Sequence, residues 1–129
     1  MSTVSRSGLE RTGFHLHVIR GLDAGESIER GQVCRVNPGG EIVLSNASND
    51  DASAEVDGFA NHSASYGETL TLSCNGAEME YDNAPLTPGE TLYLAETDGE
   101  LDTAPTTGDS VGIARALESD RIKIFTRPR

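Results

Sequence analysis

The chain contains three histidines, and their spacing is the first feature that could support chemistry. His15 and His17 are two residues apart, so on a β-strand both imidazole rings would lie on one face, as a pair of metal ligands requires. His62 is the third histidine, and no cysteine or carboxylate cluster has the spacing of a zinc site. We therefore expect these histidines to face solvent and the protein to hold no metal.

The two cysteines, Cys34 and Cys74, both fall within alternating apolar patterns. The simpler interpretation is that they are small buried core residues with free thiols, and the alternative is a disulfide between facing strands. A reactive thiol needs a positively charged environment, whereas Arg35, next to Cys34, would point to the opposite face of a strand. We expect no nucleophilic role for either cysteine.

Carboxylates are abundant, but their order does not match a known site. Residues 49–51 and 98–102 offer oxygen ligands without the Asp-x-Asp-x-Asp-Gly order of a calcium loop. The motifs of serine hydrolases, phosphate loops, zinc proteases and dinucleotide-binding folds are also missing from the sequence. Aromatic residues make up 5% and Trp is absent, which argues against a sugar-binding or base-stacking groove. We expect no catalytic residues, no cofactor and no enzymatic activity.

Length and charge limit the class of protein. The 129 residues suffice for one domain with a real core. The formal net charge of −11 makes a nucleic-acid partner unfavourable, because a phosphate backbone needs a cationic surface. No apolar stretch approaches the ~18 residues of a membrane span, and the first residues lack the apolar region of a secretory signal. We expect a soluble protein without a nucleic-acid or membrane partner.

The basic residues are unevenly chosen, since 9 of the 10 are Arg and the exception is Lys123. An acidic surface with almost no Lys is typical of proteins adapted to high salt, where self-repulsion is screened within about 3 Å at molar ionic strength. We infer a salt-loving source. The alternative is an ordinary acidic protein from a GC-rich genome.

Positive charge gathers at the two ends of the chain, in residues 1–20 and 115–129, while the middle is strongly acidic. Basic ends on an acidic protein suggest that they contact something acidic, either the protein's own middle or a neighbouring subunit, although solvated tails would have the same composition. Residues 1–13 have no apolar period and are predicted to be a flexible N-terminal arm. Residues 14–129 are predicted to be a single β domain.

From Phe14 onward apolar residues alternate with polar ones in short runs, which is the pattern of strands with one buried face. Turn-forming pairs such as Gly39-Gly40, Asn75-Gly76 and Asp98-Gly99 separate the runs. The sequence therefore predicts an all-β fold, a small β-sandwich or barrel. A helix is conceivable only at residues 111–117, where we favour a strand, and residues 46–55 are predicted to be a loop.

One local pattern, Gly-Glu-hydroxyl-aliphatic, occurs three times, beginning at Gly25, Gly67 and Gly89. We expect the Gly to close a turn, the Glu to lie in water and the aliphatic residue to begin a buried strand. A second repeated pattern, Gly-apolar-Ala, occurs at Gly58-Phe59-Ala60 and at Gly112-Ile113-Ala114. These patterns are too irregular to predict a solenoid.

Six stretches in order resemble the capsid decoration, or head cement, proteins of tailed viruses. They begin at Gly31, with Gln32-Val33-Cys34-Arg35-Val36, and end with Ile122-Lys123-Ile124-Phe125. Between them lie 56–60 leading to 67–72, then 86–94, 99–101 and 111–116. Each stretch is a glycine turn with a strand, and together they span about three quarters of the chain.

The resemblance implies a β-rich homotrimer on the outer face of an icosahedral head, bound to the major capsid protein and without catalytic residues. It further implies location in the virion, after synthesis in the cytoplasm of the host. Two alternatives remain open at this stage: a β-sandwich surface or adhesion module of a halophilic cell, and a small ligand-binding or hydrolytic β-barrel.

The N-terminal arm is the candidate capsid contact. In an acidic virion it is the most basic mobile segment, so we expect it to order on a neighbouring capsid subunit. Its contact residues would be Val4, Arg6, Leu9 and Arg11.

Overall fold

A computed structural model of the chain describes residues 17–81 and 86–125, and it confirms the predicted all-β fold. The first five strands are β1 (Val18–Asp23), β2 (Val33–Val36), β3 (Ile42–Leu44), β4 (Gly58–Ala60) and β5 (Thr69–Ser73). The next five are β6 (Glu78–Glu80), β7 (Thr91–Leu94), β8 (Leu101–Asp102), β9 (Ala114–Glu118) and β10 (Arg121–Ile124). One short 3-10 turn, η1 (Ala52–Ala54), interrupts the predicted loop at 46–55.

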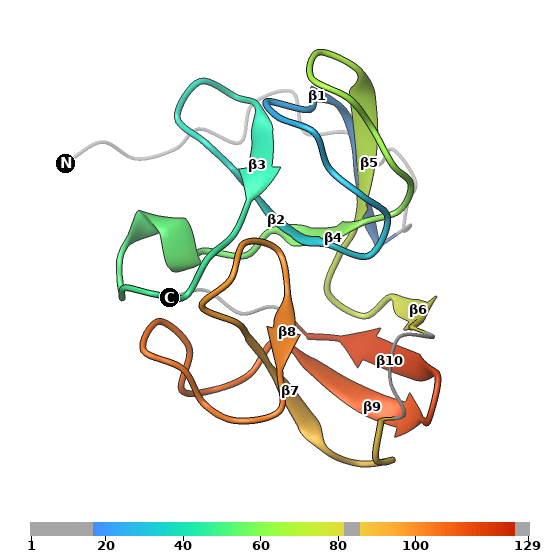
Figure 1. Cartoon of the computed structure of the whole chain (residues 1–129). Coiled ribbons are helices and arrows are strands. Elements are labelled where there is room, and N and C mark those ends of the chain that lie inside the picture. The colour runs from blue at the N-terminus through green and yellow to red at the C-terminus, as the bar shows by residue number, and fades with distance from the viewer. Residues whose placement is uncertain (1–16, 82–85, 126–129) are drawn as a thin grey trace, which may run out of the picture.

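The strands form two five-stranded antiparallel sheets, each made from a continuous half of the chain. The first sheet has the order β1-β5-β4-β2-β3, and the second has the order β6-β10-β9-β7-β8. Figure 1 shows the blue-to-green strands of the first sheet on one side and the yellow-to-red strands of the second on the other. The described part of the chain is therefore two consecutive β units packed together.

The two units have the same topology. When β6 to β10 are renumbered as the first to fifth strands of their own unit, the second sheet has the order 1-5-4-2-3, which is the order of the first. The strand registers also agree: Val33 is opposite Phe59 in the first unit, and Thr91 is opposite Arg115 in the second. The repeated sequence patterns do not mark this duplication, because the register makes Gly58-Phe59-Ala60 equivalent to Ala114-Arg115-Ala116 and not to Gly112-Ile113-Ala114.

Matching backbone hydrogen bonds confirm the equivalence of the two units. In the first, Gly31 N donates to Ala60 O over 2.8 Å and Ala60 N donates to Gln32 O over 2.9 Å. In the second, Gly89 N donates to Ala116 O over 2.7 Å and Ala116 N donates to Glu90 O over 2.9 Å. Equivalent positions can therefore be compared residue by residue between the units.

Each unit begins its second strand from the same kind of turn. Residues 29–32 and 87–90 have glycine at the third position with φ of +90° and +88°, and the fourth residue's N–H donates to the first residue's carbonyl. These are the features of a type II turn, in which the third residue needs positive φ. The side chains of Gln32 and Glu90 accept the N–H of the first residue, over 2.8 and 2.9 Å.

We expected the glutamates of the Gly-Glu-hydroxyl-aliphatic pattern only to lie in water. In the structure each of them also accepts a backbone hydrogen bond. Glu68 accepts the N–H of Ser65 over 2.6 Å and Glu90 accepts that of Thr87, while Glu26 accepts the N–H of Leu44 over 2.9 Å. Each carboxylate stays near the surface and binds a backbone N–H that its turn or strand edge leaves unpaired.

The apolar residues form two cores. One lies within the first unit, whose sheet curls until Ala24, just after β1, bridges to Ile42 of β3. The other lies between the units, where Val33 and Phe59 of the first sheet pack against the inner face of the second. All three residues of β4 are buried, because this strand has a core on each side.

Candidate functional site

Both cysteines are free thiols, as the simpler interpretation predicted, and the alternative of a disulfide between them is wrong. Cys34 is fully buried within the first core, and burial together with the nearby charge of Glu26 raises its pKa to about 12. Burial and the charge of Asp57 also raise the pKa of the half-buried Cys74. A thiol with a raised pKa is a poor nucleophile at neutral pH, so the two cysteines act as packing residues.

The histidines do not come together as a metal site among the residues that the structure describes. His17 is exposed just before β1, and the ring of His62 accepts the N–H of Thr71 over 3.3 Å in the loop before β5. His15 lies outside the described residues. No group of three or more potential ligands is found within 17–81 and 86–125.

In the part of the chain that the structure describes, one carboxylate is buried, and its bonds are structural. Asp109 is 2% exposed, and its Oδ2 accepts the N–H of Leu94 over 2.9 Å. Its Oδ1 accepts the N–H groups of Val111 and Gly112, over 3.0 and 2.8 Å. The carboxylate thus ties the loop before β9 to the end of β7.

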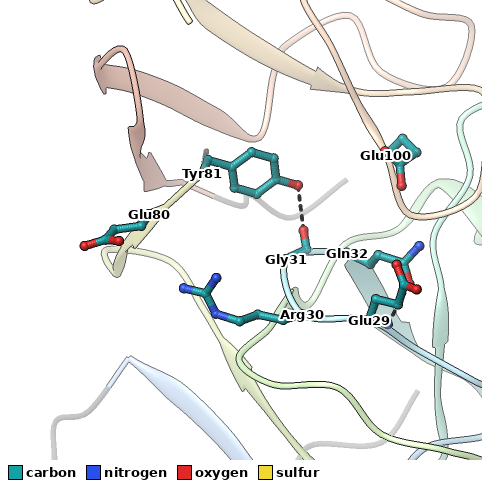
Figure 2. Close-up of a pocket in the computed structure, with 7 residues that line it drawn as sticks. All are labelled: Glu29, Arg30, Gly31, Gln32, Glu80, Tyr81 and Glu100. Atoms are coloured by element: carbon teal, nitrogen blue, oxygen red, sulfur yellow. Dashed lines mark hydrogen bonds between the residues drawn. The ribbon is translucent and has the colours of Figure 1, made fainter. Parts of the chain in front are cut away.

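A small hollow of about 90 Å³ lies where the two units meet, lined by Glu29, Arg30, Gly31, Gln32, Glu80, Tyr81 and Glu100. Figure 2 shows Tyr81 reaching across it, with its hydroxyl donating to Gly31 O over 2.6 Å. Burial, followed by the charge of Glu100, raises the pKa of Tyr81 to about 12. Tyr81 therefore stays protonated and links the end of β6 to the turn before β2.

The most distinctive surface is the face of the second sheet that points away from the cores. Strand alternation directs Leu92, Ala114 and Ile122 inward, and these side chains are buried. The same alternation directs their neighbours outward. One row across the sheet joins Glu78 of β6, Lys123 of β10, Arg115 of β9 and Thr91 of β7. We call Arg115 and Lys123 the cationic pair.

Within residues 17–81 and 86–125, the cationic pair is short of negative partners. Glu78 is directly opposite Lys123, but its carboxylate binds Arg121 over 2.9 Å, and Arg121 also binds Glu118 over 3.1 Å. Those two contacts are the ion pairs found within the described residues. Arg115 Nε makes one long hydrogen bond, 3.4 Å, to Gly89 O. Two exposed cations therefore lie side by side on a strongly acidic protein.

Sequence reasoning placed the site elsewhere. The predicted contacts Val4, Arg6, Leu9 and Arg11 lie outside the described residues, as do Arg127 and Arg129. The excess of positive charge in 115–129 was noticed, but charge alone could not show that Arg115 and Lys123 share a face. The register of β9 and β10 brings them together, and this depends on the bulge after Arg121.

Comparisons with known proteins do not assign the chain to a group. No family model matches the sequence, and no curated protein matches it at a significant level. Within the described residues, no helix has the length and apolar character needed to cross a membrane.

Proposed function

We propose that the chain is a capsid decoration protein, a non-enzymatic virion component that binds the major capsid protein on the outer face of an icosahedral head as a homotrimer. The host would be a salt-loving archaeon, and no nucleic acid or membrane would be involved. The proposal starts from the resemblance of six ordered stretches to this class of protein.

One structural observation supports the proposal: these stretches fall on strands of both β units, whereas β1, β3 and β6 lie outside them. Residues 31–36 form the end of a type II turn and β2, and residues 86–94 form the equivalent turn and β7. Strands β4, β5, β8, β9 and β10 overlap, in that order, residues 56–60, 67–72, 99–101, 111–116 and 122–125.

The chemistry of the described residues is consistent with a binding role. The thiols are buried or have raised pKa values, the buried carboxylate binds backbone N–H groups, and the hollow between the units is small and bridged by Tyr81. Two sheets packed through an apolar core, with few unbonded reactive side chains among the described residues, suit a protein that stiffens a shell.

The test is binding to heads assembled from the major capsid protein encoded nearest to this chain. The full-length protein should saturate expanded heads and raise the temperature at which they disassemble. Light scattering in high salt should give a mass three times that of the chain. Failure to bind expanded heads at tens of micromolar would overturn the proposal.

A further inference from the structure

Because the two units have the same topology, each residue on the outer face of the second sheet has an equivalent residue in the first sheet. Register and hydrogen bonds make Thr91 equivalent to Val33, Arg115 to Phe59 and Lys123 to Ser73. Val33 and Phe59 are 0% exposed, because their face is where the first unit packs against the second. The same face of the second unit carries the cationic pair and is open.

In the first unit this face binds the second unit. The equivalent face of the second unit differs from it mainly in the chemistry of its side chains. Phenylalanine is replaced by arginine, and valine by threonine. The half-buried Thr91 and Tyr93 lie beside the pair on the same face of β7. Arg and Tyr are enriched in protein interfaces, where a guanidinium can form two hydrogen bonds with one carboxylate.

The arrangement of charge also needs a partner to explain it. Lys123 and Arg115 are directly opposite each other on antiparallel strands, and like charges in such positions destabilise a sheet. An acidic residue at one of the two positions would remove this cost, and acidic residues are common in the chain, which has 21 Asp and Glu. A carboxylate supplied from outside the chain would remove it as well.

We propose that the cationic pair binds the carboxylate-rich surface of a second copy of this chain. The molecule itself offers exposed carboxylates, among them Glu96, Asp98, Glu100 and Asp102, and its net charge is −11. A two-fold axis through the pair would bring cations against cations, so the pair must contact a different surface of its neighbour. Such head-to-tail contacts close into rings when the rotation allows it. This inference rests on the self-association included in the proposed function and names its contact.

Lys123 provides a direct test, because it is the one lysine of the chain and carbodiimide couples an amine to a carboxylate in contact with it. The full-length protein at about 10 µM in high salt should give covalent oligomers, with mass spectrometry joining Lys123 to Asp or Glu of another chain. Lys123→Arg keeps the charge and should lose these products, so it is the matched control. Links confined to Glu78 of the same chain would overturn the proposal.

Charge reversal gives an independent test. Arg115→Glu places an acid opposite Lys123, so the thermal midpoint should stay equal or rise, while the dissociation constant of the oligomer should increase at least about 30-fold. Arg20→Glu makes the same charge change at an exposed position of β1 and should leave the oligomer intact. A purely structural role for Arg115 would instead lower the midpoint without affecting assembly.

Binding to heads separates this inference from the proposed function. If Arg115→Glu still forms oligomers but no longer binds heads, the face contacts the capsid, and the inference fails while the proposed function stands. If the wild-type protein forms rings that never bind heads, the proposed function fails and the inference stands. If the wild-type chain stays monomeric at tens of micromolar, the inference is wrong.

Discussion

Asp109→Ala should be among the most damaging substitutions of a polar residue in this protein. The carboxylate accepts three backbone N–H groups, from Leu94, Val111 and Gly112. Val111 is 48% exposed, so water can replace the lost acceptor at its N–H. The bonds from Leu94 and Gly112 are buried, so water cannot easily replace the carboxylate there.

The magnitude follows from these two buried donors. Each buried N–H left without an acceptor costs about 1 to 3 kcal/mol, so the free energy of unfolding should fall by about 4 kcal/mol. That is a large part of the roughly 5 to 15 kcal/mol that stabilises a domain of ordinary size. The thermal midpoint should drop by roughly 15 °C for a chain of this length. Asp109→Asn keeps one acceptor oxygen and should lose about half as much.

Urea denaturation followed by circular dichroism measures the effect. The midpoint should move to lower urea with an unchanged slope, because the same surface is exposed on unfolding. Asp102→Ala is the matched control: its Oδ1 accepts the N–H of Ala104 over 3.1 Å in an exposed turn, and its loss should cost about 1 kcal/mol or less. If Asp109→Ala cost no more than this control, the assigned structural role of Asp109 would be wrong.

Three further changes should have measurable effects. Gly108→Ala should destabilise the fold by about 3 kcal/mol in urea denaturation, because a Cβ there would lie 2.5 Å from Asn49 O and 2.8 Å from Ala54 Cβ. Raising the pH should lower the thermal midpoint from pH 9 to about pH 12: the Cys34 thiol has its pKa raised from 9.0 to about 12 in the fold, so the unfolded chain loses its proton first. Raising the salt concentration from dilute buffer to molar NaCl should raise the thermal midpoint, because the net charge of −11 is then screened.

Each of these expectations has a control. Gly40→Ala changes a glycine whose Cβ would meet nothing within 4 Å, so any loss there reports the strain of its φ of +82° alone. Cys34→Ser removes the titrating thiol, and its midpoint should decline less steeply above pH 9 than that of the wild type. A midpoint that does not change with salt would remove the argument for a halophilic source.

The alternation of apolar residues was sufficient to predict the all-β class, because one buried face per strand leaves a clear period of two. Val33 and Phe59 were harder to interpret, since their strands have a core on both sides and so lose that contrast. Ala47 and Ala54 were missed altogether: they are 0% exposed in the core between the units, yet they lie in a polar segment predicted to be a loop. Their burial depends on a contact with the second unit, which local sequence does not encode.

The duplication escaped detection for a related reason. The equivalent residues Phe59 and Arg115 occupy the same place in their sheets but face a core in one unit and open surface in the other. Their chemistry has diverged with their surroundings, while the glycine turns, which serve the backbone alone, remain alike. The cationic pair could not be predicted either, because it needs the register of β9 against β10.

The division of the chain into two consecutive units bears on its synthesis. The core within the first unit uses residues from 24 to 72, so it can form while the second half is still on the ribosome. Val33 and Phe59 would then be exposed on a finished sheet until β6 to β10 emerge. For those seconds the nascent chain carries an apolar face that can attract other nascent chains, and a pause in translation near residues 74–77 would prolong the risk.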